Sequence, residues 1–249
     1  MSKPTALEHL EIEQFTWLKP IALEHLESVV AVHSCSDENS NTVPSSQGQV
    51  ELTQQLKSRF ESLAARVEVD EFANIIAKYP GRGRGVDLAP IALMIHLDTA
   101  HGTIAVPKLN QTASWQGDAI AFEKNLNLKV NIDHYPSLEQ FLGHHIIHGF
   151  GDAPFGLDDK LGLTHLLSLA TLLSNSEQTQ GLLDDLDLPP VWLIGRPDEE
   201  IGRDDALIGL ADKLKKAGII RGYTVDGIEQ EYQIVYVQLG DLDENHHYP

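Results

Sequence analysis

The chain is predicted to be an α/β protein. A twisted, mostly parallel mixed sheet would form the middle of three layers, with helices on both of its faces. Three observations lead to this prediction. Helix-like segments alternate with short apolar segments along the chain. Two of the short segments, 91–95 and 191–194, are apolar throughout, as strands covered on both faces are. Clusters of acidic and histidine residues follow several strand-like segments, which is where α/β proteins build their sites.

The first half of the chain is expected to hold a long amphipathic helix followed by two strands. Apolar residues recur there at steps of three and four, which predicts a helix with one buried face. They are Leu52, Leu56, Phe60, Leu63 and Val67. Strands are predicted at 73–79 and 91–96, because apolar residues dominate both segments. The region 102–149 has a weaker pattern, with a short strand predicted at 130–132 and a helical turn at 137–142.

The second half alternates more clearly between helix and strand. Helices are predicted at 161–173, which has a broad apolar face, and at 205–217, where Gly218 supplies a common C-terminal cap. Strands are predicted at 191–194, 219–225 and 232–239. The chain has 249 residues, of which 42% are hydrophobic, so we expect it to bury a sizeable core within a single domain spanning 1–249.

The formal net charge of −19 disfavours nucleic acids and anionic membranes as partners, because both attract basic proteins. No apolar run approaches the roughly 18 residues that a membrane span needs, and the first residues lack the apolar core of a secretion signal. We therefore expect a cytoplasmic protein. The single cysteine, Cys35, excludes an internal disulfide, so any metal site must be built from histidines and carboxylates.

Four clusters of acidic and histidine residues stand out in the sequence. Three directly follow a strand-like segment, and the fourth opens a helix. They are His96-Leu97-Asp98, Gly156-Leu157-Asp158-Asp159-Lys160, Asp198-Glu199-Glu200 and Thr224-Val225-Asp226-Gly227. Because successive strand ends of an α/β sheet converge on one crevice, we expect these side chains to lie together. Oxygen and nitrogen ligands gathered in this way can hold divalent metal ions.

The residue types within the clusters suit such a site, although each has a simpler interpretation. In His96-x-Asp98, one side chain can ligate a metal while the other orients it. Asp158 could be only a helix N-cap, but the adjacent carboxylate of Asp159 favours a compensating cation. Asp226 before a glycine could be only a turn residue.

The order of these clusters resembles the peptidase T branch, the tripeptide aminopeptidases, of the M20 zinc peptidases, from Thr42 to Gly227. Each matching segment is similar to one motif of that branch. Val43–Gln49 resembles its substrate-side loop, His96–Thr99 its HxDT motif, Gly156–Gly162 its GADDKAG motif, Pro197–Gly202 its PDEEIG motif and Tyr223–Gly227 its YTVDG motif. Because four motifs occur in the same order, agreement by chance is very unlikely.

The resemblance implies a dinuclear metal site. His96 and Asp226 would hold one Zn²⁺ ion, Glu200 would hold the second, and Asp158 would bridge the two. Cobalt or manganese could substitute for zinc. Two cations beside one water lower its pKa from 15.7 toward about 7 and polarise a scissile carbonyl.

The resemblance also implies the catalytic roles and the reaction. Asp98 would orient His96, and Glu199 would be the general base that takes a proton from water and passes it to the leaving amine. The implied activity is hydrolysis of the N-terminal peptide bond of short peptides. Two alternatives stay open: a related M20 amidohydrolase or carboxypeptidase, and a shortened, weakly active or inactive metal-binding protein.

The sequence departs from the family pattern after Asp226. Family members continue into a lid and dimerisation domain and return with a final histidine ligand, whereas this sequence ends at Pro249. The expectation is an incomplete M20-type catalytic domain without a lid, a weak second metal site and an open sheet edge that favours a homo-oligomer. The tail residues His246 and His247 are expected to be solvated rather than substitute ligands. His144, His145 and His148 are expected to be surface or packing residues, with metal or substrate contact as the alternative.

Overall fold

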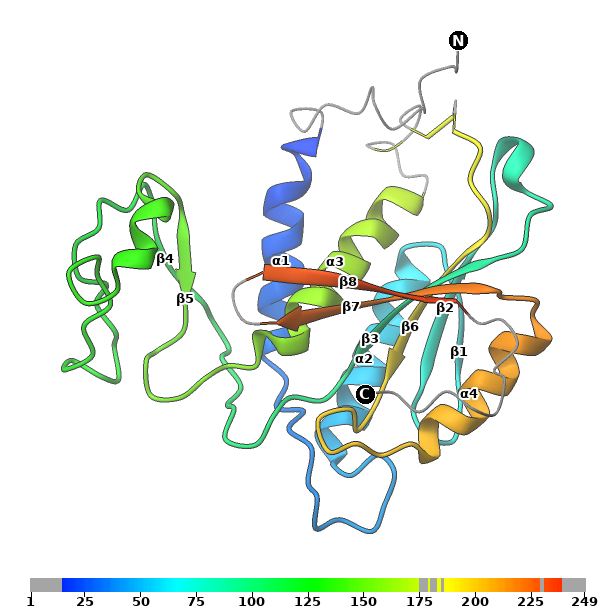
Figure 1. Ribbon diagram of the computed structural model, residues 1–249, viewed down its shortest axis with the longest axis horizontal. Coiled ribbons are helices and arrows are strands. Elements are labelled where there is room, and N and C mark those ends of the chain that lie inside the picture. Colours follow the sequence, from blue (N-terminus) through cyan, green and yellow to red (C-terminus); the bar gives the residue numbers. More distant parts are fainter. Residues whose placement is uncertain (1–14, 175–178, 180–182, 185, 229–230, 239–249) are drawn as a thin grey trace.

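A computed structural model describes residues 15–174, 179, 183–184, 186–228 and 231–238. Its main feature is a six-stranded sheet with the strand order β1-β2-β6-β3-β7-β8. The strands are β1 (Arg66–Val69), β2 (Ile75–Tyr79), β3 (Ile91–His96), β6 (Val191–Arg196), β7 (Arg221–Ile228) and β8 (Glu231–Gln238). The helices are α1 (Leu18–Val30), α2 (Gln47–Ser62), α3 (Leu157–Leu173) and α4 (Asp205–Lys216). Figure 1 shows α4 apart from the other three helices, across the sheet.

The sheet is mixed, and its centre is parallel. Strand β3 pairs in parallel with both β6 and β7, whereas β1–β2, β2–β6 and β7–β8 are antiparallel pairs. Following these pairings across the sheet, β1, β6, β3 and β7 run in one direction, and β2 and β8 run in the other. The predicted fold class, a mostly parallel mixed sheet with helices on both faces, is confirmed.

Alternate residues of the central strands face opposite layers. Ile75 and Leu193 pack into the larger core cluster with α1, α2 and α3. Their neighbours Ile76 and Ile194 pack into a second cluster with Leu210 of α4. This two-residue repeat explains why the central strands are apolar throughout: both of their faces are covered.

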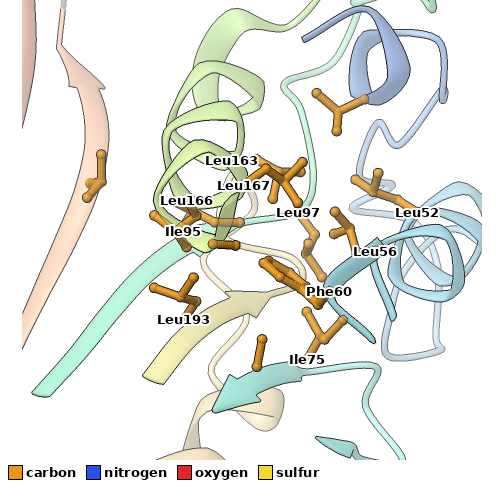
Figure 2. Packing of buried hydrophobic residues seen from close by; sticks show 14 of the residues in the cluster. Leu52, Leu56, Phe60, Ile75, Ile95, Leu97, Leu163, Leu166, Leu167 and Leu193 are labelled. Carbon is orange, nitrogen blue, oxygen red and sulfur yellow. The ribbon is translucent and has the colours of Figure 1, made fainter. Parts of the chain in front are cut away.

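The larger core lies between the sheet and the layer of three helices. Figure 2 shows side chains of α2 and α3 converging over the central strands. Labelled there are Leu52, Leu56 and Phe60 of α2, Leu163, Leu166 and Leu167 of α3, and Ile75, Ile95, Leu97 and Leu193 of the sheet and its edge. Each fully buried side chain of this size stabilises the fold by about 2 kcal/mol. This packing holds α3 against the sheet, so that the first residues of α3 lie near the ends of the central strands.

The predicted helix through Val67 ends earlier, at Ser62, and Val67 belongs to strand β1. Ala64 takes a left-handed conformation with φ of 62°. The main-chain N–H of Ala65 then donates to Phe60 O at 3.0 Å, and that of Ala64 donates to Glu61 O at 3.1 Å, which terminates the helix. The apolar spacing alone could not reveal this reversal, since Val67 suits either element.

A small lobe projects beside the main sheet (Figure 1). It contains β4 (Asn110–Thr112) paired with β5 (Ile146–His148), the 3₁₀ helix η4 (Pro136–Phe141) and a core of its own around Trp115. The predicted helical turn is therefore present. The predicted strand at 130–132 is only an isolated bridge between Ile120 and Val130. Within the described ranges, no helix has both the length and the apolar composition needed to span a membrane.

Candidate metal centre

The register of the parallel strands brings His96 and Asp226 to the same end of the sheet. Met94 of β3 lies opposite Thr224 of β7. Two residues further on, His96 and Asp226 reach the same level, and both side chains emerge on the face opposite Ile95 because strand residues alternate. Their closest atoms, His96 Nε2 and Asp226 Oδ1, lie 3.7 Å apart.

Asp158 joins this pair from the start of α3. Its Oδ1 atom lies 3.1 Å from His96 Nε2. One ligand atom from each of His96, Asp158 and Asp226 falls within 4.8 Å of the others, a group that could hold a metal ion. His96 is buried, whereas the Asp158 side chain is 51% exposed, so the group faces outward from the sheet edge. The convergence predicted from the sequence is therefore present for these three residues.

Adjacent Asp159 is not part of this group but anchors the main chain of His96. Its fully buried carboxylate accepts the main-chain N–H of His96 at 3.2 Å and that of Gly162 at 3.1 Å. A Cβ atom at Gly162 would overlap Asp159 Oδ1, and one at Gly156, where φ is +66°, would overlap the side chain of Thr99. Both glycines allow α3 to begin close to the end of β3. The two adjacent carboxylates thus have separate surroundings, a division that the sequence does not reveal.

The imidazole of His96 lies among carboxylates. Its Nδ1 atom lies 3.0 Å from the main-chain oxygen of Asp98 and 3.4 Å from Asp98 Oδ1. Burial alone would lower the pKa of His96, but hydrogen bonds to Asp158, Asp226 and Asp98 and the charge of Asp159 outweigh it and raise the pKa well above its ordinary value. The carboxylates around this ring therefore favour a positive charge, either on the imidazole or beside it.

Asp98 also contacts residues 198–203, the turn that follows β6 and that we call the acidic turn. Its Oδ1 and Oδ2 atoms accept the main-chain N–H groups of Glu199 and Glu200, both at 3.0 Å. Burial would raise the pKa of Asp98, but the hydrogen bond and charge of His96 and these two N–H groups outweigh it and lower the pKa. One buried carboxylate thus lies against both the imidazole and the turn that carries the predicted base.

Glu199 and Glu200 lie at the rim of the centre rather than in the three-residue ligand group. The Oε1 atom of Glu199 lies 3.3 Å from Nη2 of Arg196, a residue that was not among the predicted site residues. Burial raises the pKa of Glu200, and the charges of Asp158, Asp98 and Glu199 raise it further against the opposing effect of His96. Glu200 therefore already lies within the electrostatic reach of the centre.

A cavity of about 420 Å³ opens beside Glu200. Its walls come from the loop before α2, the loop after β3 and the acidic turn. They are formed by Ser36, Asp37, Glu38, Asn39, Ala100, His101, Glu200 and Ile201. A polar cavity next to candidate metal ligands is a suitable place for a small polar substrate.

Three other histidines named from the sequence lie in the small lobe. His144 contacts Phe141, and His148 contacts Phe122, each edge to face, within the small lobe. His145 is exposed. His246 and His247 lie outside the described residues.

Known proteins resemble this chain in sequence. No family model matches the chain. Peptidase T of Bacillus thuringiensis subsp. konkukian is 30% identical over 203 residues, and peptidase T of Bacillus mycoides is 29% identical over 203 residues. The chain is a sequence relative of peptidase T. The resemblance inferred from the motifs is thereby confirmed. Each alignment covers 80% of this chain but 46% of the relative, so the chain spans about half the length of these peptidases.

Solved structures show the same fold. Aminopeptidase PepT from Bacillus cereus superposes with a TM-score of 0.50 at 17% identity, covering 84% of this chain and 43% of that one. Human carnosine dipeptidase 1 superposes with a TM-score of 0.51 at 17% identity, covering 87% and 41% respectively. At this level of identity the likeness concerns architecture, a mixed sheet between two layers of helices.

Proposed function

We propose that this chain carries the metal-binding centre of a metal-dependent aminopeptidase of the peptidase T type, which releases the N-terminal residue of short peptides. One observation carries the proposal. His96, Asp158 and Asp226 come from three separate motifs, and their ligand atoms lie within 4.8 Å of one another. The peptidase T relatives supply the reaction class.

The atoms of this group fit a metal ion. When His96 Nδ1–H donates to the main-chain oxygen of Asp98, the lone pair of Nε2 faces Asp158 Oδ1 at 3.1 Å and Asp226 Oδ1 at 3.7 Å. All three facing atoms are then acceptors, and only a cation between them, a proton or a metal ion, relieves their repulsion. Imidazole with carboxylates is a donor set that zinc accepts.

We assign the first Zn²⁺ ion to His96, Asp158 and Asp226, and a second, weaker one to Asp158 and Glu200. Cobalt and manganese are expected to substitute. When bound there, such ions lower the pKa of coordinated water and polarise the scissile carbonyl. Asp98 keeps His96 in one tautomer through its main-chain oxygen and carboxylate, 3.0 and 3.4 Å from Nδ1.

Glu199 is the proposed general base. Its main-chain N–H donates to Asp98 Oδ1 at 3.0 Å, and this bond fixes the position of the Glu199 backbone at the rim of the centre. In the reaction, Glu199 accepts a proton from the attacking water and delivers it to the leaving amine. Arg196, 3.3 Å from the Glu199 carboxylate, restrains that side chain before substrate arrives.

The test is metal content followed by peptide hydrolysis with added zinc, cobalt or manganese. A free tripeptide should lose its N-terminal residue, whereas the same tripeptide with an acetylated N-terminus should stay intact. Cleavage of the acetylated peptide would favour a related amidohydrolase or carboxypeptidase. Bound metal without turnover of either peptide would favour an inactive metal-binding protein, and absence of bound metal would refute the proposal.

A further inference from the structure

Asp198, directly before the proposed base, is fully buried and held by the start of α2. Its carboxylate accepts the main-chain N–H of Ser45 at 2.8 Å, the Ser45 hydroxyl and the Nε2 amide of Gln49 at 2.7 Å. Its own main-chain N–H donates to Gln49 Oε1 at 3.0 Å. Gln49 thus contacts both the side chain and the backbone of Asp198, from a position 149 residues away in the sequence.

These contacts change the interpretation of the segment Val43–Gln49. Its resemblance to a substrate-side loop suggests side chains that face substrate, yet Ser45 and Gln49 are both buried and bonded to Asp198. Side chains used in this way are unavailable to a ligand. Their effect on any reaction must pass through the turn that they hold.

That turn needs external support. Asp198 has φ of +58°, a left-handed conformation that a non-glycine residue adopts only when its surroundings impose it. Arg203, at the far end of the turn, donates to the main-chain oxygens of Thr42 at 2.6 Å and of Ser40. From the opposite side, Asp98 accepts the N–H groups of Glu199 and Glu200. The acidic turn is therefore held on one side by the segment before α2 and on the other by the loop after β3.

We propose that Ser45, Gln49 and Asp198 form a positioning clasp. The clasp holds the main chain of the turn so that Glu199 and Glu200 keep their positions relative to His96. The inference rests on the proposed function for its catalytic consequence, but its structural content does not. Glu199 is only partly buried and Glu200 is exposed, so the precision of their side chains depends on a fixed main chain. Loss of the clasp lets the turn move while the strands stay in place.

The first experiment compares Gln49→Glu with Gln54→Glu in the full chain. Gln49→Glu keeps the shape of the side chain but sets a second carboxylate against Asp198, whereas Gln54 is exposed on the same helix. Amide hydrogen exchange followed by NMR should show at least about tenfold faster exchange at Glu199 and Glu200 in Gln49→Glu alone, with β3 and β6 still protected.

The same variants are then titrated with Co²⁺ and assayed with a tripeptide. Gln49→Glu should keep the dissociation constant of the first Co²⁺ ion within about threefold, weaken the second by about 10- to 100-fold and lower kcat by at least about tenfold with little change in KM. If the unaltered chain binds no Co²⁺, the proposed function fails, and the exchange data still decide the clasp.

A second variant tests the clasp by rescue. Combining Gln49→Glu with Asp198→Asn exchanges the positions of acid and amide, so that the new amide nitrogen donates to the new carboxylate and the Ser45 N–H still has an acceptor. Protection at Glu199 and Glu200 should return to near that of the unaltered chain. The clasp is refuted if Gln49→Glu leaves that protection unchanged, if it unfolds the strands equally, or if the double variant is no better than Gln49→Glu.

Discussion

Oδ1 of Asp98 accepts the main-chain N–H of Glu199 at 3.0 Å, across 101 residues of sequence. This bond ties the end of β3 to the turn after β6. Because the same carboxylate lies 3.4 Å from His96 Nδ1, a change at Asp98 should affect both the proposed metal ligand and the proposed base.

Asp98→Asn should lower peptidase activity by about 10- to 100-fold and weaken metal binding by a smaller factor. The new amide can accept only one of the two N–H groups of Glu199 and Glu200, and its NH₂ group opposes the other. Steady-state kinetics and zinc calorimetry measure the two effects. Asp133→Asn, an exposed acid in the small lobe, is the matched control. Equal activity of the two variants would contradict the role given to Asp98.

His96→Ala should weaken the first metal ion by at least about 100-fold, because it removes the nitrogen donor from a group with two carboxylates. Isothermal titration with Zn²⁺ measures the change. His145→Ala is the control, and it also tests the alternative that the histidines at 144–148 contact metal. If His145→Ala lost as much affinity as His96→Ala, the assignment of the centre would be wrong.

Glu199→Ala should abolish turnover while leaving metal content nearly intact, because Glu199 lies outside the ligand group. Metal analysis and a tripeptide assay on the same preparation provide the measurement. Glu123→Ala removes an exposed carboxylate for comparison. Full activity in Glu199→Ala would remove Glu199 from the role of general base.

The stability of the protein should depend on the neutral form of His25. The Thr171 hydroxyl donates to Leu167 O, so it accepts from His25 Nε2–H at 3.1 Å, while Nδ1 accepts from Arg59 at 3.3 Å. Burial, and then the charge of Arg59, lower the pKa of His25 from 6.5 to about 4, against a small opposing effect of Glu24.

Since this pKa is lower in the folded state, the unfolded chain gains the proton first as the pH falls. The stabilisation is therefore complete above about pH 6.5 and is lost progressively toward pH 4, by up to about 3 kcal/mol. Urea unfolding of the unaltered chain and of His25→Gln between pH 7 and pH 4 measures it. His33→Gln, an exposed histidine, is the control. Parallel pH profiles for the chain and His25→Gln would contradict this account.

The core between the sheet and the three helices should be sensitive to truncation. Leu193→Ala should lower the free energy of unfolding by about 2–5 kcal/mol, because Leu193 is fully buried in the central strand β6. Leu126→Ala, at a side chain that is 83% exposed, should change it by less than about 0.5 kcal/mol. Chemical denaturation measures both, and similar losses in the two variants would argue against this core.

The sequence predicted most of the elements because their signals are local. The strand predicted at 91–96 is β3 with the same limits, and the helix predicted at 205–217 ends at Lys216. The signal failed where a single residue reversed the chain direction, as at Ala64, which left Val67 in a strand. In the small lobe, β4 and β5 were not predicted, because each is three residues long and pairs only through tertiary contact.

The sequence by itself determined which side chains could make the candidate centre, because His96, Asp158, Glu200 and Asp226 each follow or open an element that its own periodicity defines. Only the tertiary structure decided how they meet. It placed the Asp159 carboxylate against the main-chain N–H of His96, the Asp98 carboxylate against the main-chain N–H of Glu199, and the Gln49 amide against Asp198. The physical reason is that these pairs join residues whose partners are set by strand order and helix packing, and no spacing along the chain records those contacts.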